Sequence, residues 1–369
     1  MQLKFENTNR MKLLEQIKIG KRLLVNRMAM APMTRCRATI DGIVGPSTVL
    51  YYSQRSGAGL IISEAINISK QATGSPLTPG LYTQEQINAW KKVTHAVHEQ
   101  GSTIYAQLWH TGRVGHSLVK NGALPVAPSA IGIQGQQHFT LEGMKDYETP
   151  KALTIDEIKQ IIKDFKQAAF NAIEAGFDGV ELHSAFGYLP NQFLAESSNH
   201  RDDAYGGSIE NRNRFVLEVM QEIVSAIGED KAAIRLSPTS TYNNMTHQQP
   251  IEQFTTLIEH LNKLPLSYIH LMKVPFPADK FPQYPEDVIE TFGKIAKHPI
   301  IANCGYTQET GEAELQKGIA TMISYGTLFL ANPDLPKRFE LNTELNQADR
   351  ASMYGGKDQG YIDYPFLTN

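Results

Sequence analysis

Two hydrophobic patterns alternate along the chain: short apolar runs, and longer segments whose apolar residues recur at helical spacing. The short runs are RMAMAP (27–32), GLIISEAI (59–66), TIYAQLW (103–109), GVELH (179–183), AAIRLS (232–237), SYIHLM (267–272), PIIAN (299–303) and ATMISY (320–325). Such an alternation is typical of βα units around a parallel sheet. Because eight parallel strands close a barrel, the pattern predicts an α/β fold of the (β/α)8 TIM-barrel type.

The longer segments predict amphipathic helices. The clearest begins at Thr154, where Glu157 completes a T-x-x-E capping box, and it ends at Gly176. Its apolar face consists of Ile158, Ile161, Ile162, Phe165 and Ala169. A second helix carries an apolar face made of Ile251, Phe254, Leu257, Ile258 and Leu261.

Residues 111–150 do not follow the alternation, because this stretch is rich in Gly, Pro and Gln and has little periodicity. Loops of about 40 residues in compact domains are usually functional lids or excursions. We therefore expect a lid-like insertion after the third strand, over one end of the barrel. No linker divides the chain, so residues 1–369 are predicted to form a single domain with an N-terminal hairpin cap.

Composition narrows the classes of partner. The 369 residues carry a formal net charge of -3, which gives no basic surface of the kind that nucleic acid or anionic membranes require. The apolar runs are much shorter than the roughly 20 residues that cross a bilayer, and the first residues lack the apolar centre of a secretory signal. With only Cys36 and Cys304 present, no disulfide framework is expected, and a cytoplasmic location is the default.

Polar residues end most of the predicted strands. In a barrel of this type the chemistry lies at the C-terminal ends of the strands. The residues at those ends are Pro32, Met33, Thr34, Glu64, Ala65, Gln107, Trp109, His183, Arg235, His270, Asn303, Cys304, Gly305, Gly326 and Thr327. Each alone is compatible with an ordinary hydrogen-bonded structural residue. Together, an amide, a guanidinium, an imidazole and a hydroxyl suit a planar, carbonyl-rich ligand that gains negative charge.

Glycine-bearing turns follow the last two strands, in NCGYT (303–307) and YGTLF (325–329). Phosphate groups in these barrels are often held by such turns and by a short helix N-terminus. A ligand with an anionic tail is therefore expected there.

Several longer motifs resemble the Old Yellow Enzyme family, and most closely its bacterial N-ethylmaleimide and pentaerythritol tetranitrate reductases. These motifs cover nearly the whole chain in the expected order: APMTR (31–35), QLWHTGR (107–113), VAPSA (126–130), AGFDGVELHSAFGYL (175–189), YGGSIENR (205–212), IRLSP (234–238), ANPDLP (331–336), and the closing YGG (354–356) and GYIDYP (360–365). The resemblance implies a flavoprotein with noncovalent FMN that takes hydride from NAD(P)H and passes it to electron-poor alkenes such as α,β-unsaturated carbonyls, maleimides or nitro compounds.

The resemblance also implies roles for individual residues. Those expected to contact the isoalloxazine ring are Pro32, Met33, Thr34, Ala65, Gln107, His183 and Arg235. Those expected at the phosphate are Cys304, Gly305, Gly326 and Thr327. His183 would hold the substrate oxygen and Tyr188 would deliver the proton, which makes these two the catalytic residues. Trp109, Phe186 and Tyr354 would complete the substrate pocket, and no metal is expected.

Three residues depart from the family pattern. Phe186 stands where family members carry His or Asn, so one hydrogen-bond donor to the developing oxyanion is lost, which typically costs about a hundredfold to a thousandfold in rate. Thr327 replaces an Arg, so FMN would bind on the order of ten to a hundred times more weakly unless another Lys or Arg compensates. Cys304 stands where glycine is common, and it is strained if the backbone there has a positive φ.

These departures keep a second hypothesis open: a barrel of this family with weakened flavin binding or altered activity. A third hypothesis, a metal-dependent hydrolase with His183, His270 and Glu64 as ligands, is disfavoured because Arg235 in the same pocket would repel a divalent cation. The residues do not choose between NADH and NADPH, or between a monomer and a homodimer. The expected partner is a small electron-poor alkene or nitro compound, with no nucleic acid and no membrane.

Overall fold

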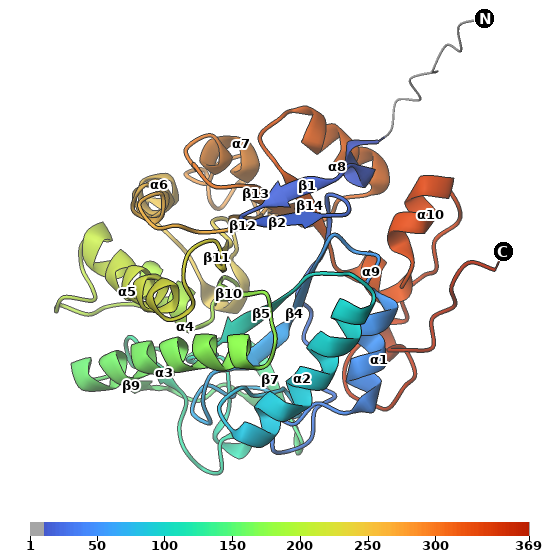
Figure 1. Cartoon of the computed structure of the whole chain (residues 1–369). Helices are drawn as coiled ribbons and strands as arrows, with labels where there is room; N and C mark the ends of the chain where they lie inside the picture. Colours follow the sequence, from blue (N-terminus) through green and yellow to red (C-terminus); the bar gives the residue numbers. More distant parts are fainter. Residues whose placement is uncertain (1–10, 369) are drawn as a thin grey trace, which may run out of the picture.

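The computed structural model describes residues 11–368 and contains a closed barrel of eight parallel strands that follow one another in chain order (Figure 1). The barrel strands are β3 (Met28–Met30), β4 (Leu60–Asn67), β5 (Ile104–Trp109), β10 (Gly179–Ser184), β11 (Ala232–Leu236), β12 (Tyr268–Met272), β13 (Ile300–Asn303) and β14 (Met322–Tyr325). All eight predicted strands and the predicted fold class are confirmed. The first strand is shorter than its apolar run, which continues to Pro32, a residue with no N–H to donate to a ladder.

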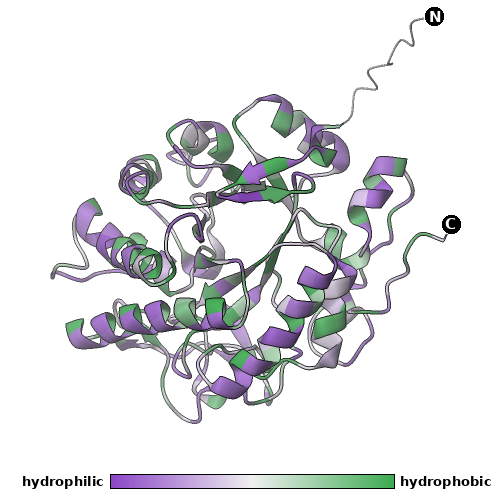
Figure 2. Cartoon of the chain, viewed as in Figure 1, coloured by the Kyte–Doolittle hydropathy of each residue, from purple (hydrophilic) through white to green (hydrophobic). Residues whose placement is uncertain are grey.

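Helices surround the barrel. They are α1 (Pro46–Gln54), α2 (Gln84–Glu99), α3 (Ile155–Glu174), α4 (Leu189–Leu194), α5 (Ile209–Ile227), α6 (Pro250–Leu261), α7 (Val288–Gly293), α8 (Gln308–Gln316), α9 (Thr327–Ala331) and α10 (Leu335–Leu341). Figure 2 shows the long helices with polar residues on their outer side, while the strands behind them are mostly apolar. This arrangement buries one continuous layer between strands and helices.

Helix α3 begins as the sequence predicts. The Thr154 hydroxyl accepts from the Glu157 N–H, and the Glu157 carboxylate accepts from the Thr154 N–H at 2.9 Å, so the capping box is complete. In α6 the predicted apolar face is wrong at one position. Ile251 is 47% exposed, because the buried face of the first turn runs through Pro250 and Gln253 instead.

An antiparallel hairpin of β1 (Ile17–Ile19) and β2 (Arg22–Leu24) lies across the N-terminal end of the barrel, where Figure 1 shows it in front. Ile19 and Leu24 pack with residues from inside the barrel, including Tyr105 and Tyr268. Arg22 adds an ion pair to Asp178 at 2.7 Å. The predicted hairpin cap is therefore present, and it leaves only the C-terminal end of the barrel open to ligands.

Residues 111–150 contain more regular structure than their composition predicts. Strands β7 (Gln137–Thr140) and β8 (Gly143–Asp146) form a hairpin, and β6 (Val126–Ala127) pairs with β9 (Lys151–Ala152). The sequence does not predict these strands because they are short and do not alternate buried apolar with exposed polar residues. Apolar side chains such as Phe139 and Met144 are exposed. The segment is fastened to neighbouring loops by bonds such as that from the Arg113 guanidinium to the Asn243 carbonyl, at 3.0 Å.

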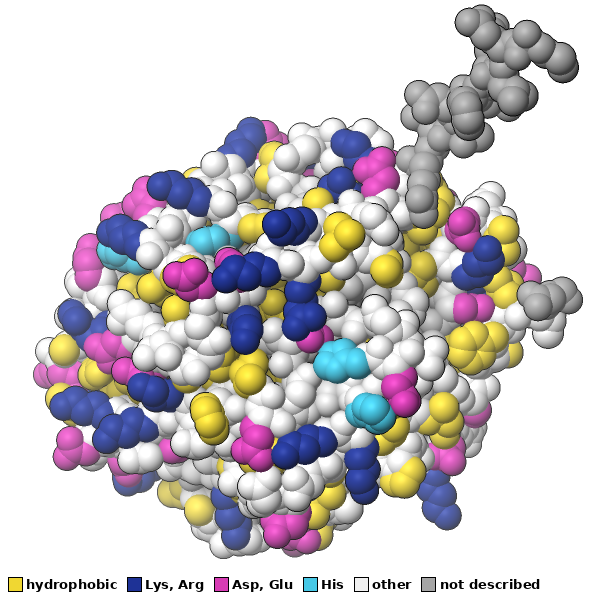
Figure 3. Space-filling view, viewed as in Figure 1, with side chains coloured by type: hydrophobic (Ala, Val, Ile, Leu, Met, Phe, Trp, Pro, Cys, Tyr) yellow, Lys and Arg dark blue, Asp and Glu magenta, His cyan; other side chains and the backbone are white. Residues whose placement is uncertain are grey.

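The predicted single domain covers residues 1–369, of which residues 1–10 and 369 lie outside the described part. On the face shown in Figure 3, basic and acidic side chains are interspersed. Within residues 11–368, no helix has the length and apolar character needed to cross a bilayer.

Candidate active site

A cavity of about 560 Å³ opens at the C-terminal ends of the barrel strands, within the size range of small-molecule sites. Most of the predicted site residues line it: Pro32, Met33, Thr34, Gln107, His183, Phe186, Tyr188, Arg235, Cys304, Gly305, Gly326, Thr327 and Tyr354. We call the part around Thr34, Gln107, His183 and Arg235 the ring end. The part around residues 304–305 and 326–327 is the phosphate end.

Two predicted residues do not line the cavity. Trp109 is 1% exposed and packs edge-on behind Tyr188, with ring centroids 4.9 Å apart. Ala65 is buried beside Gln107 in the sheet, after an irregularity in the pairing of β4 with β5. Both positions touch the site only through a neighbour. A position at the end of a strand does not show whether a side chain lines the cavity or lies behind a neighbouring side chain. The sequence therefore could not separate Trp109 and Ala65 from the lining residues.

Gln107 is held by a chain of buried polar groups that crosses the barrel interior. Its amide Nε2 donates to Glu181 at 2.8 Å, the other Glu181 oxygen lies 2.9 Å from His270 Nδ1, and His270 Nε2 lies 2.8 Å from the Ser324 hydroxyl. Burial alone would raise the pKa of Glu181, but His270, Arg235 and Gln107 together hold it below its usual value. A fixed negative charge therefore lies directly behind Gln107, and it leaves the Gln107 carbonyl oxygen free for a ligand.

Arg235 supplies the positive charge at the ring end. One of its terminal nitrogens donates to the Asn303 side chain at 2.7 Å, while its Nε is buried with no partner among the described residues. Burial lowers the pKa of Arg235, whereas the Glu181 carboxylate acts in the opposite direction. A guanidinium remains charged at neutral pH, so it is a stable partner for an acceptor that becomes anionic.

His183 and Tyr188 face each other at the cavity wall, with ring centroids 4.8 Å apart and an interplanar angle of 72°. Burial, reinforced by the charge of Arg235, lowers the pKa of His183 well below its usual value. Burial also raises the pKa of the Tyr188 phenol above its usual value. At neutral pH the pair therefore consists of a neutral imidazole and a protonated phenol, which are a hydrogen-bonding group and a proton donor.

Phe186 lies in the turn between these two residues. Its φ is +54° and that of Gly187 is +78°, so two successive left-handed residues reverse the chain and place Tyr188 at the start of α4. The turn is held by the Ser237 hydroxyl, which accepts from the Phe186 N–H at 3.0 Å. The Phe186 ring lies 5.9 Å from the Arg235 guanidinium, so an apolar face replaces a donor at this wall.

The phosphate end is made mainly of backbone. Cys304 has a φ of +96° and Gly305 a φ of +75°, so the conformation that would strain a cysteine is present. Helix α9 begins at Thr327, and the first N–H groups of a helix have no partners within it. These turns offer N–H donors to an anion, whereas Thr327 offers no charge.

The cavity also has lining residues that were not predicted. They include Arg35, Met272, Tyr306, Thr307, Ser324, Tyr325, Leu328 and Met353. Most lie within a few residues of a strand end, so a wider window after each strand would have found them. Met353 precedes the predicted Tyr354 in the chain. The Arg35 guanidinium donates to the Met353 carbonyl at 2.5 Å.

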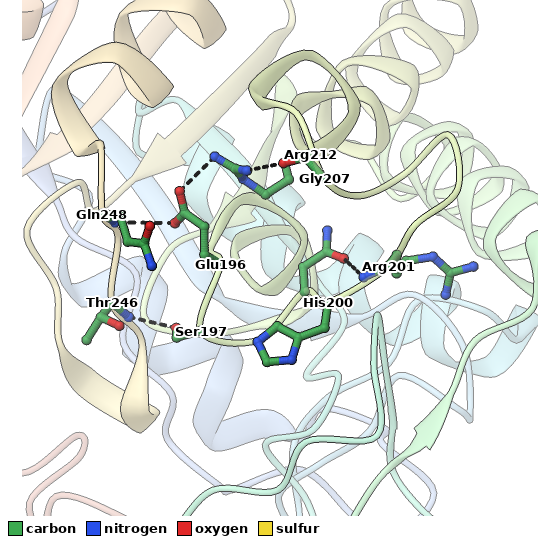
Figure 4. Close-up of a pocket in the computed structure, with 9 residues that line it drawn as sticks. Glu196, Ser197, His200, Arg201, Gly207, Arg212, Thr246 and Gln248 are labelled. Carbon is green, nitrogen blue, oxygen red and sulfur yellow. Dashed lines mark hydrogen bonds and ion pairs between the residues drawn. The ribbon is translucent and has the colours of Figure 1, made fainter.

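A second cavity of about 450 Å³ lies beside residues 196–212 and 246–248 (Figure 4). Its charged groups are already paired. Arg212 binds Glu196 at 2.8 Å, and Arg201 makes an ion pair with Asp203. In Figure 4 dashed lines join Glu196 to Arg212 and to the backbone of Gln248, and Arg212 to the backbone of Gly207. The cations there are neutralised, unlike the unpartnered groups of the first cavity.

The ligand set suggested for a metal does not assemble. His270 is bonded to Glu181 and Ser324, and Glu64 accepts from the Arg35 N–H at 3.3 Å. Burial raises the pKa of Glu64 to about 7. Within residues 11–368, no three His, Cys, Asp or Glu side chains converge as metal ligands would.

The donor set fits FMN. The buried Arg235 Nε and His183 Nδ1 have no partner in the described protein, and buried polar atoms rarely stay unsatisfied. Gln107 and Arg235 would contact the polar edge of the isoalloxazine ring. The backbone of residues 304–305 and 326–327 would hold the phosphate, at the opposite end of the same cavity.

Known proteins match this chain over most of its length. The family model described as "NADH:flavin oxidoreductase / NADH oxidase family" covers residues 12–346. "12-Oxophytodienoate reductase 1" of Oryza sativa subsp. japonica is 42% identical over 96% of this chain and 93% of its own length.

Solved structures agree with the fold. Morphinone reductase in complex with tetrahydroNAD is 42% identical, with a TM-score of 0.91 over 97% of this chain and 98% of its own. The Old Yellow Enzyme homologue from Zymomonas mobilis is 39% identical, with a TM-score of 0.92 over 96% of this chain and 100% of its own. The chain belongs to the NADH:flavin oxidoreductase / NADH oxidase family, that of the Old Yellow Enzymes, and it is an oxidoreductase with FMN as cofactor and NAD(P)H as reductant.

Proposed function

We propose that the enzyme reduces electron-poor alkenes, such as α,β-unsaturated carbonyls, maleimides and nitroalkenes, and that Tyr188 supplies the proton. The observation that carries this proposal is the pairing of His183 with Tyr188 at the wall of the cavity that holds Gln107 and Arg235. When bound, FMN supplies the hydride chemistry, accepting hydride from NAD(P)H and donating it to the alkene. The protein supplies binding, orientation and the proton.

His183 has the position and protonation state to bind the activating oxygen of the substrate. Its buried Nδ1 has no partner among residues 11–368, and a neutral imidazole donates from one nitrogen only. A donor aimed at this oxygen stabilises the negative charge that develops when hydride reaches the β-carbon. Phe186 adds no second donor, so His183 carries this task alone.

Tyr188 completes the reaction by protonating the α-carbon. Its phenol lies partly buried at the cavity wall and remains protonated at neutral pH, because desolvation raises its pKa. Trp109 packs edge-on against the phenol ring from behind and limits its movement. The relatives named above are reductases of 12-oxophytodienoate and of morphinone, and both names denote molecules with a keto group, which supports a carbonyl-activated substrate.

The two half-reactions test the proposal separately. Protein reconstituted with FMN should be yellow, should bleach with NADPH or NADH under anaerobic conditions, and should regain its colour with N-ethylmaleimide or 2-cyclohexenone. Tyr188→Phe should slow the recovery of colour by roughly a hundredfold to ten-thousandfold, the typical contribution of a general acid, and leave the bleaching unchanged.

Tyr82→Phe is the matched control, because Tyr82 lies outside the cavity lining. If Tyr188→Phe reoxidises as fast as the control, Tyr188 is not the proton donor. A protein that stays colourless with added FMN would favour the alternative of a barrel with weakened flavin binding.

A further inference from the structure

The phosphate end of the cavity has a cation close by, although Thr327 supplies none. Lys273 directly follows β12, and its N–H donates to the Asn303 carbonyl at 3.0 Å, which holds it beside the end of β13. Its ammonium nitrogen lies 5.0 Å from the ring centroid of Tyr306. Tyr306 lines the cavity together with Cys304 and Gly305, so Lys273 lies one strand away from the phosphate turn.

In the described part of the chain no carboxylate forms an ion pair with Lys273, although its charge helps to lower the pKa of the nearby Asp287 carboxyl. Within residues 11–368, no acidic oxygen lies within 4.0 Å of its Nζ, and its ammonium lies over the aromatic face of Tyr306. The neighbouring Asp287 forms its ion pair with Lys317, at 3.6 Å. Burial raises the pKa of the Cys304 thiol, whereas the positive charges of Arg235 and Lys273 act to lower it. The charge of Lys273 therefore acts on the turn that contains Cys304.

Three other cations in this part of the barrel already have hydrogen-bond or ion-pair partners. Arg235 is bonded to Asn303 at the ring end, and Arg338 binds Asp334 at 2.7 Å on α10. Lys317 is shared between Asp287 and Glu314. Lys273, by contrast, contacts Tyr306 beside the phosphate end and forms no ion pair within 4.0 Å among the described residues.

We propose that Lys273 provides the positive charge for the FMN phosphate, in place of the charge absent at Thr327; this rests on FMN being the cofactor. An ammonium on a flexible four-carbon stem is a point charge that suits phosphate. The Tyr306 ring holds the ammonium near the turn by a cation–π contact. The backbone N–H groups of the two turns fix the position of the phosphate, and Lys273 adds the charge.

Binding of FMN and riboflavin by the apoprotein tests this inference, with the quenching of flavin fluorescence as the measurement. Lys273→Met should weaken FMN binding roughly tenfold to a hundredfold, the effect of one charge-assisted hydrogen bond. It should change riboflavin binding less than about twofold, because riboflavin has no phosphate. The dependence of FMN affinity on salt concentration should also become weaker.

Two further variants complete the test. Lys280→Met is the matched control, since Lys280 is an exposed lysine of the same loop, and it should leave both affinities unchanged. Adding Thr327→Arg to Lys273→Met should restore FMN affinity by returning a cation to the same end.

Equal FMN affinity of Lys273→Met and the unaltered protein would overturn the inference and leave the proposed function intact. An equal loss for FMN and riboflavin would also overturn it, because the effect would then not concern the phosphate. An unaltered protein that binds no FMN would overturn the cofactor assignment together with the inference.

Discussion

The two ends of the cavity differ in what lines them: side chains form the ring end, and backbone turns form the phosphate end. At the ring end, buried side chains are held by charged or polar partners, as Gln107 is by Glu181 and Arg235 by Asn303. At the phosphate end, backbone turns form the surface, and the nearby cation, Lys273, lies against Tyr306. Where charge develops during the reaction, the side chains must be held in place. A phosphate needs N–H groups and a positive charge that more than one position can supply.

Breaking the support behind the ring end should have the largest effect. Glu181→Gln removes the buried charge that faces Arg235 and orients Gln107. Removing one partner of a buried charge pair typically costs about 3–5 kcal/mol, so the free energy of unfolding should fall by that amount in urea titrations. The flavin potential should rise, since Arg235 would then stabilise the reduced flavin without an opposing charge.

The control for this change is Glu222→Gln, which breaks an exposed ion pair with Lys166. Exposed pairs contribute about 0–1 kcal/mol. If both variants lose the same small amount of stability, the buried chain behind Gln107 is not what distinguishes the ring end.

Adding a donor to the ring end should have the next largest effect. Phe186→His should raise the rate of alkene reduction by up to about a hundredfold to a thousandfold, the usual contribution of one oxyanion donor. The left-handed backbone at this position accepts His more readily than Phe. Stopped-flow reoxidation of the reduced flavin measures the rate. Phe186→Leu, which adds no donor, should bring no gain, and an unchanged rate in Phe186→His would show that His183 alone suffices.

The phosphate end should tolerate a side-chain change that keeps its backbone. Cys304→Gly removes a side chain from a residue with a φ of +96° and should stabilise the protein by about 1 kcal/mol in thermal unfolding. FMN affinity should stay within about twofold, because the turn binds through N–H groups. Cys304→Ala retains the strain and should give no gain. A large loss of FMN affinity in Cys304→Gly would show that the thiol itself takes part.

Much of this arrangement could be predicted from the sequence, for a local reason. The eight strands and helix α3 follow from apolar periodicity and a capping box, which depend on neighbouring residues. Parallel strands in a barrel bring all their C-terminal ends to one face, so a strand-end list finds Gln107, His183 and Arg235 together. The family motifs then supply the cofactor.

Only the tertiary structure decided which of these side chains meet. Trp109 lies behind Tyr188, and Glu181 joins Gln107 to His270, because strands distant in sequence are neighbours or face each other across the barrel. Lys273 approaches the phosphate end through Tyr306 of the next βα unit. The sequence by itself determined the barrel strands and the open end of the barrel, since both follow from local pattern and topology. Contacts between side chains far apart in the chain depend on packing, and no local pattern specifies them.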